Sequence, residues 1–243
     1  MYRNKKKLVF ISGPIGKPLF LLAPGIIWLI LFGLLPLVFM FIMSFWSSTI
    51  YGTNPDFTFE NFKRVIFTEL YREQLFKTLR IAAITTIITL IISYPVAFLL
   101  SKMKGKKKAL LVLLMFLPFW TSYVIRSFVW LPILGRNGAI NIFLLELGII
   151  EAPLDWLLYN EGAVFVGLIY VYTLFMTLPI YLSLEKIDPT LIEAATDLGA
   201  KPYRIFFKVI LPLSWPGVLS GCIMVFLLSI GAFVTPQLLG GPS

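Results

Sequence analysis

Long apolar stretches alternate with shorter polar stretches along the whole chain. Each apolar stretch holds about 20 residues or more, the length that an α-helix needs to cross a bilayer. The first stretch is too long for the apolar core of a signal peptide, which holds about 7–15 residues, so it indicates a retained span. The pattern predicts an all-α bundle with five membrane spans, at about residues 19–46, 81–100, 109–134, 163–184 and 213–236.

The polar stretches between these spans also carry structural signals. Residues 60–67 and 141–148 each predict a short helix outside the spans. Gly217 and Gly221, together with Ser214, form a surface of small residues on the last span. Such a surface predicts close packing against another helix, either in this chain or in a second, related subunit.

The composition narrows the possible functions. The chain has 243 residues, of which 58% are hydrophobic and 14% charged, whereas a soluble domain is about 45–50% apolar. It contains no histidine, so His-based metal sites, His general bases and Ser-His catalytic pairs are excluded. We therefore expect a transport protein rather than an enzyme, with no catalytic residue and no metal site. The single cysteine, Cys222, lies in an apolar run and predicts a buried structural thiol.

The net charge of +9 is concentrated at the ends of the spans. Of the 21 Lys and Arg residues, 14 lie in residues 1–18, 101–108 and 185–208, and eight of the 12 acids lie in the other polar stretches. Basic loops mark the cytoplasmic side of a membrane protein. We predict a basic cytoplasmic segment at 1–18 followed by a transmembrane domain at 19–243. The same distribution favours membrane orientation over nucleic-acid binding.

Residues 185–212 form the longest polar interruption in the second half of the chain. Asp188 and Pro189 are typical of a helix start, because Asp caps free backbone N–H groups and Pro suits the first helical position. Gly199 predicts the helix end, at a positive φ and with close approach to another chain. Pro202 predicts the start of a second helix. This segment therefore predicts two helices on the cytoplasmic side.

One spacing in this loop is specific. Glu193-Ala194-Ala195 is followed by three residues, Gly199, nine residues, Val209, one residue and Leu211-Pro212. The pattern resembles the EAA loop of type I ABC importer permeases, which usually have Ile where Val209 stands. The resemblance implies a coupling helix that contacts a cytoplasmic ATPase. It implies this role for Glu193, Ala194, Ala195, Asp197, Gly199, Leu211 and Pro212.

The resemblance extends over nearly all of the chain and carries further expectations. It implies a multi-pass protein of the bacterial inner membrane with a cytoplasmic N-terminus. The implied partners are two ATPase subunits, a second homologous permease, an extracellular solute-binding protein and the lipid bilayer. No cofactor is expected in this chain, since ATP and Mg²⁺ would be bound by the ATPase. Permeases of this family normally have one more span after the last one predicted here.

The segment at 117–126 is the most unusual part of a predicted span, and it joins a proline, aromatic rings, hydroxyls and a charge. A charge in mid-span costs roughly 2.5–3.5 kcal/mol on insertion scales. Either this segment lines a translocation path, or Arg126 extends to the outer interface and the aromatic residues form a membrane belt. The candidate path residues are Trp120, Thr121, Tyr123, Arg126 and Tyr172.

The same segment resembles spermidine/putrescine permeases, so the resemblance implies polyamine import. A permease of the same class for ferric ion, sulfate or another solute is the alternative. A secondary transporter would need an ion-coupling site, usually acidic, inside a span, and no Asp or Glu lies well inside any predicted span.

Overall fold

The computed structural model describes residues 16–49 and 52–241 of the chain. Residues 1–15 of the predicted basic segment lie outside the described residues. The chain divides into two compact units, Met1–Leu75 and Phe76–Ser243. The long helix α5 (Glu69–Lys102) contributes residues to both.

The first described helical segment of the first unit is apolar and largely exposed. Its parts are α2 (Gly16–Leu29), a π-helical turn (Ile30–Leu34) and α3 (Leu35–Met43). The π turn directly precedes Pro36, which lacks a backbone N–H, and the Leu35 N–H bonds to the Ile30 carbonyl. In the most apolar part of this segment, no residue is buried. A helix that is apolar all round in this way suits a lipid or protein environment rather than water.

A short hairpin and a helix complete the first unit. Strands β1 (Ser47–Thr49) and β2 (Gly52–Asn54) pair antiparallel, with Ser47 opposite Asn54. Helix α4 (Glu60–Phe67) has the bounds predicted from the sequence. The Asn61 side chain donates hydrogen bonds to the carbonyls of Ser44 and Trp46, and Phe45 stacks on Phe57 with ring centroids 4.8 Å apart.

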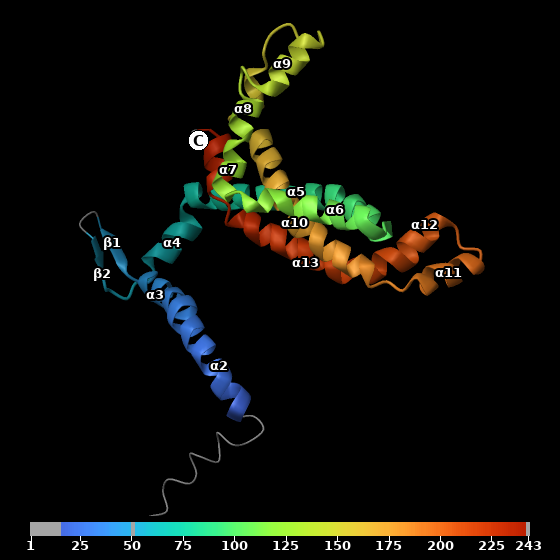
Figure 1. Ribbon diagram of the computed structural model, residues 1–243. Helices are drawn as coiled ribbons and strands as arrows, with labels where there is room; N and C mark the ends of the chain where they lie inside the picture. Colours follow the sequence, from blue (N-terminus) through green and yellow to red (C-terminus); the bar gives the residue numbers. More distant parts are fainter. Residues whose placement is uncertain (1–15, 50–51, 242–243) are drawn as a thin grey trace, which may run out of the picture. The chain divides into compact units, whose positions relative to one another are not determined.

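The second unit is built around α10 (Glu161–Glu185). Among the candidate spans of the described chain, α10 has the largest share of its most apolar part buried. Helix α13 (Leu211–Ile230) lies along it (Figure 1). A Cβ atom on Gly217 would meet the Pro179 carbonyl at 2.5 Å, and one on Gly221 would meet Met176 Sδ at 2.8 Å. The predicted small-residue surface therefore packs within this chain, because only glycine lets the two backbones approach so closely.

Helix α5 packs on the same core through small side chains. Thr85, Thr89, Ser93 and Ala97 recur at every fourth position, and all four are fully buried. The Ser93 hydroxyl donates a hydrogen bond to the Thr173 carbonyl of α10 at 3.3 Å. This spacing places one face of α5 against the bundle and leaves the opposite face to the bilayer.

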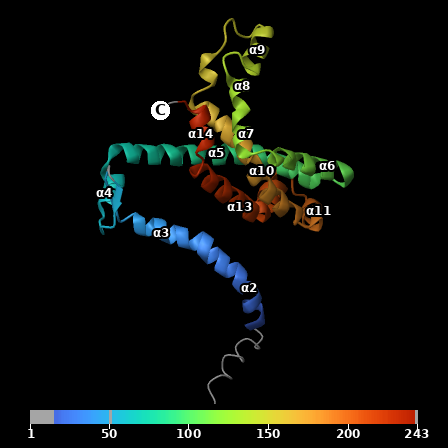
Figure 2. The same ribbon diagram turned by 60° about the vertical axis from the view of Figure 1, so that its left-hand side comes forward.

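The predicted span 109–134 is not one continuous helix. It consists of α6 (Gly105–Phe116), a 3₁₀ turn (Leu117–Trp120), α7 (Tyr123–Phe128) and α8 (Trp130–Leu134). Pro118 lies at the start of the 3₁₀ turn, and Thr121 has an extended backbone, so the α-helical hydrogen bonds stop there. The chain changes direction between α6 and α7 (Figures 1 and 2).

The other elements of this unit are short. They are α9 (Ala139–Glu146), a 3₁₀ turn (Asp155–Leu157), α11 (Pro189–Asp197), α12 (Pro202–Ile205), a π turn (Phe206–Ile210) and α14 (Val234–Leu239). Helix α9 begins two residues before the predicted helix 141–148. The last predicted span, 213–236, differs more, because helical structure runs from Pro202 to Ile230 and breaks at Gly231.

Five helical segments of the described chain are long and apolar enough to cross a membrane, as predicted. The third differs in position from the predicted span 109–134, since it begins after the break at Thr121. The segments are Leu21–Met43, Glu69–Lys102, Tyr123–Glu146, Glu161–Glu185 and Pro202–Ile230.

Candidate functional site

The predicted coupling helix is α11, and its start is capped as the sequence indicates. The Asp188 carboxylate accepts a hydrogen bond from the Thr190 backbone N–H at 3.0 Å, and Pro189 takes the first helical position. This hydrogen bond lowers the pKa of Asp188, because it favours the charged carboxylate. The cap fixes where α11 begins after α10 ends.

The end of α11 is a Schellman motif. The Ala200 N–H bonds to the Ala195 carbonyl at 3.0 Å, and the Gly199 N–H bonds to the Thr196 carbonyl at 2.8 Å. Gly199 has φ +76°, so the prediction of a positive φ is confirmed. A Cβ atom there would meet nothing within 4 Å, so within this chain the requirement for glycine is conformational rather than steric.

Helix α11 has one face toward the protein and one toward solvent. Ile192 and Ala195 are half-buried and pack against the core, whereas Glu193, Ala194 and Asp197 are exposed. Of the three motif residues at 193–195, therefore, Ala195 serves packing within the chain. Glu193 and Ala194 remain available to a partner.

Leu191 of α11 and Leu198, the residue directly after this helix, were not among the predicted site residues. Leu198 is 88% exposed and Leu191 is 47% exposed. With Ala194 they follow positions i, i+3 and i+7, so they form an apolar stripe on the outer face of α11. The helical spacing was visible in the sequence, but the direction in which this stripe faces was not.

Leu211 and Pro212 belong to a different helix from the exposed acids. They begin α13, directly after the π turn that accommodates the missing N–H of Pro212. The Leu211 carbonyl accepts a hydrogen bond from Ser214 at 3.0 Å, and the Ser214 hydroxyl is 2.9 Å from the Tyr94 hydroxyl of α5. The second half of the motif therefore anchors the loop to the bundle rather than extending the exposed face of α11.

The predicted path segment brings a buried cation against an aromatic ring. Arg126 is 9% exposed, and its guanidinium carbon lies 4.4 Å from the centre of the Phe119 ring. Within the described residues its Nε atom has no hydrogen-bond partner. The Arg126 side chain therefore packs within the second unit.

Tyr123 belongs to a hydroxyl cluster that the sequence did not reveal. Its hydroxyl is 2.9 Å from the Thr235 hydroxyl, which is also 2.7 Å from that of Ser127. Thr235 is fully buried on α14. Residues 108 or more positions apart meet here, so no local pattern could have identified Thr235 or Ser127.

Of the remaining three path candidates, one is buried and two are exposed. Tyr172 is buried, and its hydroxyl donates to the Leu228 carbonyl at 3.0 Å. Its ring contacts Phe175, which in turn contacts Phe119, so Tyr172 lies in the same aromatic group as Arg126. Trp120 is 81% exposed and Thr121 is exposed as well, so both lie outside this group. A position at the membrane interface suits Trp120.

No group of three or more His, Cys, Asp or Glu side chains suited to a metal ion occurs in the described part of the chain. Cys222 is half-buried and free.

This arrangement defines a class of protein. Five apolar segments in the described residues and a bundle centred on α10 and α13 are the features of a multi-pass membrane protein. Residues 82–243 match the family model described as the binding-protein-dependent transport system inner membrane component. The chain belongs to this family.

Individual relatives agree with the family assignment. The chain is 42% identical over 217 residues to the spermidine/putrescine transport system permease protein PotB of Haemophilus influenzae, covering 88% of this chain and 74% of that protein. It is 38% identical over 215 residues to the PotB protein of Escherichia coli K12, covering 88% and 78%.

A solved structure shows the same fold. A bacterial ABC transporter involved in the import of the acidic polysaccharide alginate matches with a TM-score of 0.65 and 18% identity, over 89% of this chain and 75% of that one. The fold class is therefore that of the ABC importer permeases, as predicted from the EAA-like spacing.

Proposed function

We propose that this chain is the membrane-spanning permease subunit of an ATP-driven importer for polyamines such as spermidine and putrescine. The observation that carries the proposal is the likeness to spermidine/putrescine permeases over 88% of the chain, at 38–42% identity. The chain would act in the bacterial inner membrane with its N-terminus in the cytoplasm. A second permease, two ATPase subunits and a solute-binding protein would complete the importer.

The aromatic and hydroxyl cluster supports a polyamine as the solute. A polyamine is a flexible chain with two to four positive charges, and each contact of an ammonium group with an aromatic face contributes about 0.5–2 kcal/mol. Tyr123 and Tyr172 supply aromatic rings, and Thr235 supplies a hydroxyl. A site of this kind attracts a polycation without trapping it, whereas buried carboxylates would hold it too tightly for release.

Arg126 is a cation beside this cluster, and its charge would limit how long a polyamine stays there. Its guanidinium already lies on the Phe119 ring, so that ring face is occupied. The charge thus raises the energy of a polycation at this level and favours its onward movement.

The exposed face of α11 supports the coupling role. Glu193, Asp197 and the apolar stripe of Leu191, Ala194 and Leu198 form a small amphipathic surface outside the spans. We assign it to contact with the ATPase, which would bind ATP and Mg²⁺ and drive the spans between outward- and inward-open states. No step of hydrolysis is assigned to this chain.

Uptake of labelled spermidine and putrescine tests the solute. Cells that lack their own polyamine uptake should gain it when they express this chain together with its whole operon. Excess unlabelled polyamine should abolish the signal, and sulfate or ferric ion should not. If neither polyamine is taken up, or if an anion competes while polyamines do not, the solute assignment is wrong.

A further inference from the structure

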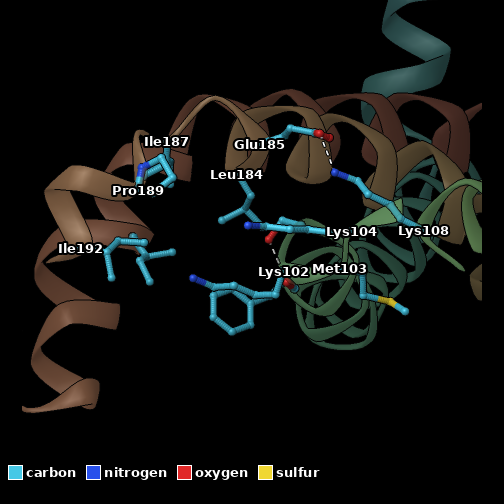
Figure 3. A pocket seen from close by; sticks show the side chains of 12 residues that line it. Lys102, Met103, Lys104, Lys108, Leu184, Glu185, Ile187, Pro189 and Ile192 are labelled. Atoms are coloured by element: carbon cyan, nitrogen blue, oxygen red, sulfur yellow. Dashed lines mark hydrogen bonds and ion pairs between the residues drawn. The ribbon is translucent and has the colours of Figure 1, made fainter. Parts of the chain in front are cut away.

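A pocket of about 380 Å³ opens where three helices of the second unit end. Helix α5 ends at Lys102, α6 begins at Gly105 and α10 ends at Glu185. Since these helices end together, the pocket lies at the level where the spans meet the lipid headgroups. Figure 3 shows Lys102 and Lys104 reaching toward the cavity from one side, with Ile187, Pro189 and Ile192 facing them from the other.

The pocket has an excess of positive charge. Three lysines and one carboxylate line it, and Lys108 Nζ is 2.5 Å from Glu185 Oε1, so these two charges neutralise each other. Among the described residues, Lys102 and Lys104 have no acid within ion-pair distance. Lys102 instead lies over the Phe98 ring, 5.4 Å from its centre. Two positive charges therefore remain available to a ligand.

Apart from Ser101, the rest of the lining is apolar. Leu184 and Ile210 are buried, and Ile187, Ile192 and Met103 are half-buried. A site with two free cations at its rim and an aliphatic wall fits an amphiphile with an anionic head. A free phosphate would not use the apolar wall, and the lysines would repel a polyamine.

We propose that this pocket binds the headgroup of an anionic phospholipid. The lipid phosphate contacts Lys102 and Lys104, and the first part of an acyl chain lies along Ile187, Ile192 and Ile210. Basic pockets at the ends of spans are suited to anionic headgroups, with about 1 kcal/mol contributed by each lysine near the surface. The proposal needs only that the chain lies in a bilayer, so it stands or falls independently of the transported solute.

A bound lipid would connect two parts of the chain. Lys102 is the last residue of α5 and Lys104 directly precedes α6, whereas Pro189 and Ile192 belong to α11. The lipid would restrain the base of α11 against this turn. Anionic lipid would thereby stabilise the position of the exposed face of α11.

The basic turn itself supplies a matched control. Lys106 and Lys107 lie a few residues further on, in the first turn of α6, and are exposed, but they do not line the pocket. The double variant Lys102→Ala/Lys104→Ala and the control Lys106→Ala/Lys107→Ala thus remove the same charge from neighbouring positions. Retention of the wild-type thermal unfolding midpoint in both variants establishes that both fold.

Native mass spectrometry of the purified full chain, titrated with phosphatidylglycerol or phosphatidylcholine, measures the binding. Wild type and control should bind one phosphatidylglycerol in preference to phosphatidylcholine. The pocket variant should bind it about 30-fold more weakly, which corresponds to ~2 kcal/mol for two lysines. Equal loss in both double variants, or equal affinity for the two lipids, would overturn the proposal. Displacement of the lipid by millimolar inorganic phosphate would also overturn it, in favour of a free-anion site.

Discussion

At the scale of single residues, the loop at 185–212 is shaped by backbone hydrogen bonds. Asp188 caps the start of α11 and Gly199 ends it at φ +76°. Both roles could be predicted from residue type, because few side chains cap a helix well and few residues adopt a positive φ. The face of α11 that points away from the bundle could not be predicted in the same way, because the exposure of Leu198 depends on how α11 lies on the bundle.

The cap at Asp188 predicts a pH dependence of α11. The lowered pKa of Asp188 means that the folded state favours the carboxylate. The stabilisation that this cap gives to α11 is therefore complete above the ordinary Asp pKa of about 3.9, and it is lost as the pH falls through the lowered pKa of the folded state. Hydrogen exchange at the Thr190 amide, expressed as a protection factor relative to the unstructured amide, provides the measurement.

Two variants separate the cap from the charge. Asp188→Asn keeps a capping oxygen but does not titrate, so its Thr190 protection should stay constant across the acidic range. Asp188→Ala should lose protection at every pH. Loss of protection in acid that is the same for wild type and Asp188→Asn would show that another group controls the start of α11.

At the scale of elements, the closest contact is that of α10 with α13. Gly217 lies over the Pro179 carbonyl, and Gly221 lies over Met176. The small-residue surface was predictable, but the sequence left its partner open between α10 and a second subunit. The partner depends on how two distant segments fold together, which no local spacing records.

This contact predicts a large effect of a single methyl group. Gly217→Ala places a Cβ atom at 2.5 Å from the Pro179 carbonyl, so the helices must move apart, at a cost of about 1–3 kcal/mol. Gly25→Ala in α2 is the control, since nothing lies within 4 Å of its Cβ. Thermal unfolding in detergent should show a lower midpoint for Gly217→Ala alone, and an equal midpoint for the two variants would refute the packing.

The third predicted span shows that hydropathy alone does not give the bounds of a helix. Residues 109–134 are apolar throughout most of their length, so they predicted one span, interrupted at Pro118 and Pro132. A break does lie at Pro118 and the extended backbone of Thr121, but the next long apolar segment starts only at Tyr123. Apolarity indicates which residues avoid water, but it does not show where the backbone hydrogen bonds of a helix stop. The cluster of Tyr123, Ser127 and Thr235 was hidden for a related reason, because Thr235 arrives from α14.

At the scale of the whole molecule, the proposed orientation rests on the distribution of basic residues. It places the 101–108 turn and α11 in the cytoplasm and residues 136–162 outside. Single cysteines at Lys106 and Glu151, both exposed, test this in a Cys222→Ala background. An impermeant thiol reagent on intact cells should label only position 151, and labelling at 106 alone would reverse the orientation.

In the proposed function, this chain couples ATP hydrolysis by a partner to the import of a polyamine. The most direct measurement is ATP hydrolysis by the purified complex in proteoliposomes, with and without the solute-binding protein loaded with spermidine. Loaded binding protein should stimulate hydrolysis in wild type and in Leu198→Met, which keeps the apolar stripe of α11. The complex with Leu198→Asp should assemble, but loaded binding protein should stimulate its ATP hydrolysis about tenfold less than in wild type. This decrease corresponds to ~1.4 kcal/mol lost at one contact. No ATPase in the purified complex, or full stimulation in Leu198→Asp, would contradict the account.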